Sequence, residues 1–333
     1  MVENRRMMIA SVPAGPLQTS HFALDIAEVA VPGDGEVLCR TLALTIGAGQ
    51  RAGLQGSASY AGAPRAGVVM NGTGVARVES SNAPGFAPGD LVVGPAGWQE
   101  YSALPAGSLR KVDPGVDPAN HLGVLGANGL TAYFGLLEIG QPNAGETVVV
   151  SAAAGSVGHV VGQIAKLKGC RVVGVAGSDE KCRLLENELG FDAAVNYKAA
   201  DFREQFRAAT PARIDVYFDN TGGLILESAL FRMNTHGRIT CCGNVSQYDT
   251  ANPAAGPRGV PGLLVNNRVR MEGFLVFDFA DRYEQGRSEM AGWITNGSLV
   301  PRIAEYHGLE SAPQAFVDLL AGKNVGTTIV RVG

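Results

Sequence analysis

The most specific chemical signal in the sequence is a turn of small residues, Ala152–Gly158, which follows the apolar run Thr147–Val150. Its glycines have the spacing of a dinucleotide-binding fingerprint, with Ala153 in the first glycine position. Small residues let the backbone approach a pyrophosphate, and free N–H groups at the start of a helix bind its charge. The turn predicts dinucleotide binding, although a strand–helix turn without a ligand can share this pattern. The residues expected to hold the pyrophosphate are Gly155, Ser156, Val157 and Gly158.

A second polar group follows the next strand-like run, Arg171–Ala176, and bears on which dinucleotide is bound. An NAD site usually places an acid at the tip of this strand, where it binds the ribose 2′-OH. Here the run leads into Ser178 and Lys181, a hydroxyl and a cation that could hold a 2′-phosphate. This arrangement favours NADPH or NADP over NAD. The simpler alternative is that Ser178 caps a helix and Lys181 is a solvated residue of its first turn.

Composition and charge exclude several other classes of function. The formal net charge of −4 provides no positive field for nucleic acid or an anionic membrane. No stretch approaches the roughly 18 apolar residues of a membrane span, and the polar N-terminus lacks a signal-peptide core. The five cysteines are scattered without a Cys-x-x-Cys pair, which is typical of reduced thiols. We therefore expect a cytoplasmic protein that acts on a small molecule and binds neither nucleic acid nor membrane.

The pattern of apolar residues divides the chain into three segments. Residues 1–125 contain β-like runs such as Glu36–Leu44 and Val68–Met70, broken by glycine and proline turns, and predict a barrel-like domain. Residues 126–300 alternate strand-like and helical patterns, which predicts βαβ units around a parallel sheet. Residues 301–333 revert to short elements that could return to the first domain. The strands expected in the middle segment are Thr147–Val150, Arg171–Ala176, Ile214–Phe218, Arg238–Cys241 and Val269–Phe277.

Ordered motifs along nearly the whole chain resemble the prostaglandin reductase, alkenal double-bond reductase and curcumin reductase branch of the medium-chain dehydrogenase/reductase superfamily. The motifs are Gly129–Leu136, Gly145–Val148, Gln163–Cys170, Gly177–Lys181, Asn196–Lys198, Phe218–Gly223, Cys242–Tyr248, Gly308–Phe316 and Gly322–Gly326. The resemblance implies an α/β protein with a GroES-like β-barrel catalytic domain, formed by residues 1–125 and the tail 301–333. A doubly wound Rossmann domain that binds NADP would occupy residues 126–300. It also implies a homodimer, in which the Val269–Phe279 region could pair across a two-fold axis.

The same resemblance assigns individual cofactor contacts. Lys181 and Tyr197 stand where relatives contact the 2′-phosphate region, and Asn220 and Asn324 where they bind the ribose and nicotinamide side. The other positions that would line the cofactor are Cys242, Gly243, Ser246, Phe274 and Val276. Each has a plainer alternative: Tyr197 as a packed edge aromatic, and the two asparagines as turn residues.

Zinc is not expected to polarise the substrate. The region Arg65–Met70 lacks a Gly-His-Glu element, and the five histidines are dispersed, with His159 expected at the surface. If a hydride adds to Cβ of an unsaturated carbonyl compound, negative charge develops as an enolate, which a hydroxyl donor would stabilise. By resemblance Tyr248 is this donor, assisted by the 2′-OH of the nicotinamide ribose, and Tyr60 is a second tyrosine facing the substrate. The alternative for Tyr248 is a structural residue of a turn.

The predicted function is NADPH-dependent reduction of the C=C bond of α,β-unsaturated aldehydes or ketones. Two alternatives stay open: a quinone reductase of the zeta-crystallin-like type, and a non-catalytic NADPH-binding protein. Secondary-alcohol oxidation is disfavoured because the zinc ligands are missing. Three departures from the family pattern stand out: Ala127-Asn128 in place of Met-Pro, Asp249 in place of Asn, and Thr327 in place of Lys.

Overall fold

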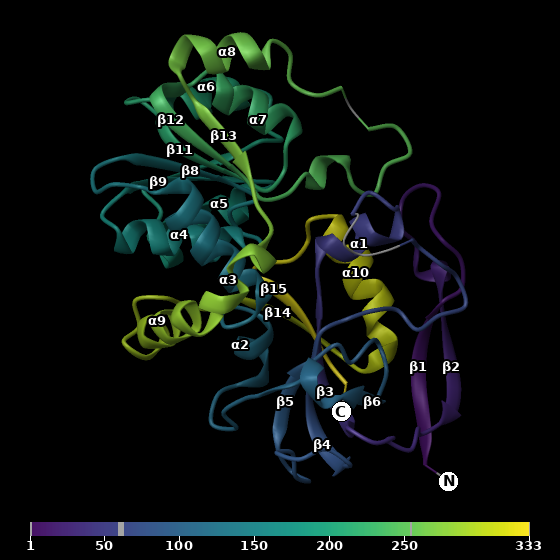
Figure 1. The fold of residues 1–333 in the computed structure, drawn as a ribbon. Coiled ribbons are helices and arrows are strands. Elements are labelled where there is room, and N and C mark those ends of the chain that lie inside the picture. The colour runs from purple at the N-terminus through teal and green to yellow at the C-terminus, as the bar shows by residue number, and fades with distance from the viewer. Residues whose placement is uncertain (1, 59–62, 254, 333) are drawn as a thin grey trace. The chain divides into compact units, whose positions relative to one another are not determined.

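The computed structural model describes residues 2–58, 63–253 and 255–332. The chain divides into two compact units (Figure 1). The first unit runs to Gly123 and also takes in Tyr248–Ala251 and the tail from Ile303. The second comprises Val124–Gln247 and Asn252–Arg302. The sequence-based division near residues 125 and 300 did not anticipate the excursion of Tyr248–Ala251 into the first unit.

A seven-stranded sheet is the framework of the first unit. The elements of this unit are β1 (Glu3–Ile9), β2 (Phe22–Glu28), β3 (Glu36–Ile46), α1 (Ala48–Leu54), β4 (Gly74–Ser81), β5 (Leu91–Gly94), β6 (Tyr101–Pro105), β7 (Arg110–Lys111), α2 (Pro118–Leu122), β14 (Ile303–His307), α10 (Ala312–Leu320) and β15 (Thr327–Arg331). The sheet order is β14-β15-β3-β4-β5-β7, β6 also pairs with β3, and β1 and β2 form a separate pair. The expected run Val68–Met70 is not a strand, since it contributes one isolated bridge between Met8 and Val69.

An aromatic cluster joins the C-terminal tail to the core of this unit. The Trp98 ring stacks on Phe22 at 5.2 Å between centroids and meets the edge of Phe316 at 5.9 Å. Trp98 and Phe316 are fully buried. Burial of an aromatic side chain of this size contributes about 2–3 kcal/mol. Because Phe316 lies on α10 and Val330 is buried on β15, the last thirty residues are an integral part of this core.

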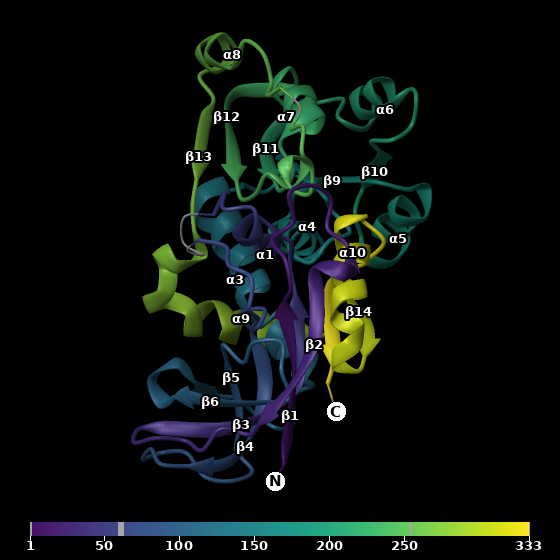
Figure 2. The same ribbon diagram turned by 90° about the vertical axis from the view of Figure 1, so that its right-hand side faces the viewer.

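The second unit is a doubly wound α/β domain. Its elements are α3 (Ala127–Phe134), β8 (Thr147–Ser151), α4 (Gly158–Leu167), β9 (Arg171–Ala176), α5 (Asp179–Leu189), β10 (Ala193–Asn196), α6 (Phe202–Ala209), β11 (Ile214–Asp219), α7 (Gly223–Leu230), β12 (Met233–Cys241), α8 (Val260–Asn267), β13 (Arg270–Gly273) and α9 (Tyr283–Thr295). Six strands run parallel in the order β10-β9-β8-β11-β12-β13 (Figures 1 and 2). The order reverses between β8 and β11, the switch point at which Rossmann domains bind their ligands. The predicted fold class is confirmed.

One predicted strand of this unit is wrong in its length. The run Val269–Phe277 was expected to be a single strand, but β13 ends at Gly273, and a tight helical turn begins at Val276. The aromatic residues that follow pack elsewhere, because the Phe279 ring stacks on Phe134 of α3 at 4.8 Å. Asp278 accepts a hydrogen bond from the Leu275 N–H at 3.0 Å and so holds the start of the turn. The segment after β13 therefore packs against α3 and does not extend the strand.

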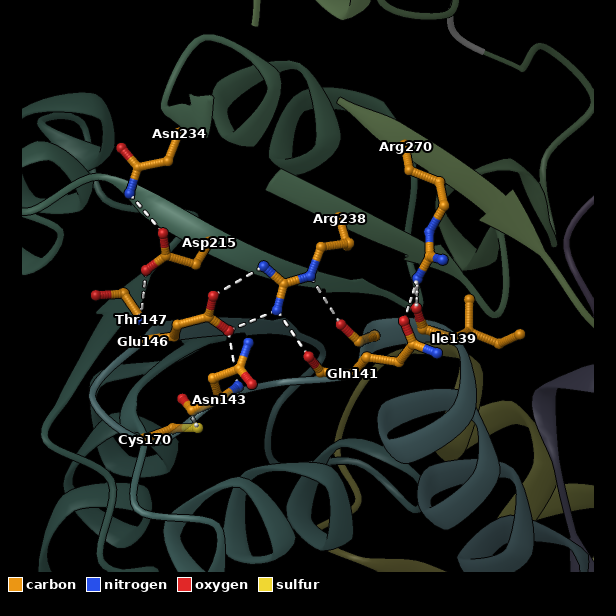
Figure 3. Close-up of polar contacts among 11 residues, drawn as sticks. Ile139, Gln141, Asn143, Glu146, Thr147, Cys170, Asp215, Asn234, Arg238 and Arg270 are labelled. Atoms are coloured by element: carbon orange, nitrogen blue, oxygen red, sulfur yellow. Dashed lines mark hydrogen bonds and ion pairs between the residues drawn. The ribbon is translucent and has the colours of Figure 1, made fainter. Parts of the chain in front are cut away.

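A polar network ties together the amino-terminal parts of the parallel strands (Figure 3). Arg238 of β12 donates to both carboxylate oxygens of Glu146, and Asp215 of β11 accepts from the Thr147 N–H of β8 at 2.8 Å. Asn234 donates to the other oxygen of Asp215 at 2.7 Å. Ligands of parallel sheets bind at the carboxyl ends of the strands, so this network, at the opposite edge, is structural. Within residues 2–58, 63–253 and 255–332, no helix has the length and apolar character needed to cross a bilayer.

Candidate functional site

The turn between β8 and α4 is closed by backbone hydrogen bonds and leaves no room for a side chain at Gly158. Gly155 N–H donates to the Ala152 carbonyl at 2.9 Å, and Ala153 N–H donates to Val175 of β9 at 3.0 Å. A Cβ on Gly158 would lie 2.3 Å from the Ala152 carbonyl oxygen, so a side chain there would displace the backbone. Ala152 itself has a φ of +47°, a left-handed conformation that is unusual for alanine. The glycines are thus required by close packing at the point where α4 begins.

His159 forms a hydrogen bond to this turn and is not the surface residue expected from the sequence. Its side chain is fully buried, and burial lowers the pKa of its imidazole to about 4. Nδ1 lies 2.8 Å from the Gly155 carbonyl oxygen, while Nε2 lies 3.3 Å from the Arg302 N–H. The carbonyl can only accept and the amide can only donate, so the neutral ring carries its proton on Nδ1. His159 therefore connects the turn to the end of the second unit.

The carboxyl ends of β8 and β11 are joined by a buried network centred on Asp219. Its Oδ1 accepts hydrogen bonds from the Thr221 and Gly222 N–H groups at 3.0 and 2.9 Å and from Tyr217 Oη at 2.9 Å. Burial raises the pKa of Asp219, against the opposing effect of these donors. Asn220 donates its Nδ2 to the Ser151 carbonyl at 2.7 Å. The network fixes the backbone of the Asn220 turn at the switch point of the sheet.

The loop after β12 packs onto this turn. Cys242 and Gly243 N–H donate to the Asp219 carbonyl at 2.9 and 3.1 Å, and Ser246 N–H donates to Thr221 at 3.0 Å. Gly222 has a φ of +67°, and a Cβ there would lie 2.2 Å from the Asn244 Oδ1. The structure therefore brings Asn220, Cys242, Gly243 and Ser246 together. Burial raises the pKa of the Cys242 thiol to about 12, so this residue can contribute its backbone but no thiolate near neutral pH.

A cationic cluster lies at the carboxyl ends of β9 and β10. Ser178 caps α5, since its Oγ accepts from the Lys181 N–H at 3.3 Å. Tyr197 is 37% exposed, and its ring centroid lies 5.8 Å from the Lys198 Nζ. Burial, and then the charge of Lys198, lowers the pKa of Lys181. We call Ser178, Lys181, Tyr197 and Lys198 the lysine cluster.

Lys198 is the functional candidate that the sequence reasoning missed. It stands in the motif Asn196–Lys198, but only Tyr197 of that motif was assigned a role. The second unit also has a cavity of about 270 Å³ beside the cluster, between Tyr197 and Leu224. The charge of Lys198 is close enough to lower the pKa of Lys181, and two neighbouring ammonium groups suit a doubly charged anion such as a phosphate.

The remaining predicted residues belong to other elements of the two units or lie outside the described residues. Phe274 packs its ring against Gly135, where a Cβ would lie 2.4 Å away, and Val276 begins the turn after β13. Tyr248 and Asn324 belong to the first unit, and Asn324 donates its Nδ2 to the Gly326 carbonyl at 2.9 Å. Tyr60 lies outside the described residues.

Comparison with known proteins gives matches along nearly the entire chain. Residues 5–112 match a family model described as the N-terminal domain of oxidoreductase, and residues 156–292 match one described as zinc-binding dehydrogenase. Although that second description names zinc, no three His, Cys, Asp or Glu side chains of the described ranges form a group that could hold a metal ion.

Individual relatives match over their full length. The chain is 44% identical to the NADPH-dependent curcumin reductase of Escherichia coli, over 99% of this chain and 97% of that one. It is 40% identical to the NADP⁺-dependent 2-alkenal reductase of Nicotiana tabacum, over 99% and 98%. The crystal structure of CurA in complex with NADPH from Vibrio vulnificus is 39% identical, with a TM-score of 0.94 and 99% of each chain covered.

Proposed function

Because the chain belongs to the zinc-independent medium-chain dehydrogenase/reductase family, we propose that it reduces the C=C bond of α,β-unsaturated aldehydes or ketones. It is an NADP-dependent oxidoreductase. The observation that carries the proposal is its full-length similarity to relatives named for curcumin and 2-alkenal reduction. Both of those substrates contain a C=C bond conjugated to a carbonyl group.

NADPH would supply the hydride when bound, and we propose residues of the second unit for its pyrophosphate, 2′-phosphate and ribose. The backbone from Ser156 to Gly158 would bind the pyrophosphate at the start of α4, and Gly155 would let the phosphate approach the turn closely. The lysine cluster would bind the 2′-phosphate through charge-assisted hydrogen bonds. Asn220 would bind on the ribose side, together with Cys242, Gly243 and Ser246. Asn324 of the first unit would contact the nicotinamide side. Phe274 and Val276 of the second unit would border the cofactor through their backbone.

Tyr248 is proposed as the donor that stabilises the developing enolate. The hydride adds to Cβ with its electron pair, the C=C electrons move toward the carbonyl oxygen, and a proton then arrives at Cα from Tyr248 or water. A phenol held at the carbonyl oxygen stabilises this transition state more than the ground state. Replacement of Tyr248 by Phe should lower kcat at least about 10-fold, which corresponds to about 1.4 kcal/mol, with NADPH affinity unchanged. Tyr60 is proposed as a second tyrosine facing the substrate.

The assembly proposed is a homodimer in which two β13 strands pair across a two-fold axis. β13 is the last strand of the six-stranded sheet and is paired on one side with β12. An edge strand offers backbone donors and acceptors to a second copy. We also place the protein in the cytoplasm, because its cysteines are free thiols. Mass measurement in solution tests the dimer.

Turnover measurements test the reaction itself. NADPH oxidation would be followed with an enal, an enone and a quinone in parallel, with NADH as the cofactor control. A product saturated at its C=C bond supports the proposal. Turnover of the quinone alone would replace it with quinone reduction. NADPH binding without turnover of any acceptor would leave a non-catalytic binding protein.

A further inference from the structure

A nearly buried ion pair connects the Tyr248 segment to the first unit. The Arg51 side chain on α1 is 2% exposed, and its Nε donates to the Asp249 Oδ1 at 2.9 Å. The same carboxylate oxygen accepts from the Leu17 N–H at 2.5 Å. Arg51 also donates its Nη2 to the Gly15 carbonyl at 2.7 Å. Three segments far apart in the sequence, around residues 15–17, 51 and 249, therefore meet at one carboxylate.

The pair has features that a chance surface contact lacks. A guanidinium removed from water requires a partner of opposite charge. Among the ion pairs of the described residues, the carboxylate that pairs with Arg51 is that of Asp249. Asp249 has a φ of +57°, a left-handed conformation that is uncommon outside glycine, and its hydrogen bonds to Leu17 and Arg51 hold it there. The family pattern that the sequence resembles has Asn here, and a neutral amide would not supply the buried Arg51 with a counter-charge. The ion pair gives a physical reason for this departure.

The location of the pair connects it to catalysis. The chain leaves the second unit after Gln247, and Tyr248–Ala251 belong to the first unit before the chain returns at Asn252. Within this short excursion, Asp249 places a carboxylate on α1 and on the 15–17 segment. Tyr248 directly precedes it, so the direction of its Cα–Cβ bond depends on how the Asp249 backbone is held.

We propose that Arg51 and Asp249 are positioning residues for Tyr248. By fixing Asp249 in its left-handed conformation, the ion pair sets the direction in which the neighbouring phenol points. This inference rests on the proposed role of Tyr248 as the donor to the carbonyl oxygen. It predicts that loss of the pair lowers kcat through Tyr248 and leaves cofactor binding intact, since neither Arg51 nor Asp249 is among the proposed cofactor contacts.

A double-mutant cycle tests the inference. Full-length wild type, Asp249→Ala, Tyr248→Phe and the double variant would be compared for kcat with an enal, KM and NADPH Kd. We expect Asp249→Ala to lower kcat about 10-fold, since small misplacements of a catalytic group have effects of this order, with NADPH Kd within about two-fold. In the Tyr248→Phe background the same substitution should change kcat less than about two-fold. Asp249→Asn, which keeps the shape and an acceptor oxygen, should fall between wild type and Asp249→Ala.

Matched variants guard against a purely structural effect. Asp25→Ala removes another ion pair of the first unit, with Arg6, and should leave kcat unchanged. If Asp249→Ala fails to fold, Asp249→Asn and Arg51→Lys carry the same comparison. Equal losses of kcat with and without Tyr248 would overturn the inference, as would wild-type kcat in Asp249→Ala. If Tyr248→Phe itself keeps wild-type kcat, the proposed donor role fails first, and this inference fails with it.

Discussion

Removal of each lysine of the lysine cluster should distinguish their contributions to NADPH binding. Lys181 is partly buried at the start of α5, where burial and the charge of Lys198 lower its pKa, whereas the Lys198 side chain is exposed. A charge-assisted hydrogen bond contributes about 1.5–3 kcal/mol when partly desolvated, and an exposed ion pair about 0.2–1 kcal/mol. We therefore expect Lys181→Ala to weaken NADPH binding by about 2 kcal/mol and Lys198→Ala by about 1 kcal/mol.

These energies correspond to an increase in NADPH Kd of about 30-fold for Lys181→Ala and about five-fold for Lys198→Ala. The affinity for NADH, which lacks the 2′-phosphate, should change less than about two-fold in either variant. Titration of each purified variant with NADPH and NADH, followed by nicotinamide fluorescence, measures both constants. The Lys198 contribution should also fade as salt is raised, because exposed charges are screened.

Lys168→Ala serves as the matched control, since Lys168 lies over Trp293 at the far end of α4 and outside the cluster. Its NADPH Kd should equal that of the wild type. Equal weakening of NADPH and NADH by Lys181→Ala would show that the residue supports the fold of the site and does not read the phosphate. A larger effect of Lys198 than of Lys181 would refute the argument from burial.

Three further perturbations follow from the geometry. Gly158→Ala places a methyl group against the Ala152 carbonyl oxygen and should weaken NADPH binding at least about 10-fold, measured by the same titration; retained affinity would contradict the proposed pyrophosphate site. Neutral buried His159 stabilises the fold fully above its ordinary pKa of 6.5, and this contribution is lost as the pH falls toward about 4. The free energy of unfolding should therefore drop by about 3 kcal/mol more in wild type than in His159→Gln over that range, by urea denaturation. Glu146→Gln should lower the free energy of unfolding by about 2 kcal/mol at neutral pH without changing kcat. Arg238 and other donors lower the pKa of this carboxylate against the effect of its burial. The difference should therefore begin to shrink as the pH falls below the ordinary value of 4.5 and be lost once it passes the lowered pKa of the folded state; a difference independent of pH would argue against the ion pair.

The sequence is informative wherever local pattern and local structure coincide. The small residues from Ala152 to Gly158 predict the turn because close backbone approach leaves no room for side chains. The apolar runs of β8 and β9 are visible because strands buried on both faces of a parallel sheet must be apolar throughout. Ser178 is identifiable as a helix cap for a similarly local reason. Such features need no knowledge of distant residues.

Contacts between distant segments were decided by the tertiary structure alone. His159 reads as a surface residue in the sequence, yet Arg302, at the end of the second unit, covers it and makes it a buried neutral base. Lys198 joins Lys181 because β9 and β10 are neighbours in the sheet. In the sequence, Asp249 is a single departure from the family pattern within a turn. The structure shows that it accepts a hydrogen bond from Arg51, almost two hundred positions earlier.

The difference between the features that the sequence predicts and those that it does not has a single physical cause. Backbone conformation and one-sided burial are imposed by neighbours within a few positions, so composition and spacing record them. Other features depend on which segments the fold places together. These are the partner of each charged group, the burial of single polar groups and the contacts that hold a candidate catalytic side chain. For this chain, the sequence by itself determined the two-part α/β architecture and the dinucleotide turn. Only the tertiary structure decided which charges face the cofactor site and which carboxylate holds the segment of Tyr248.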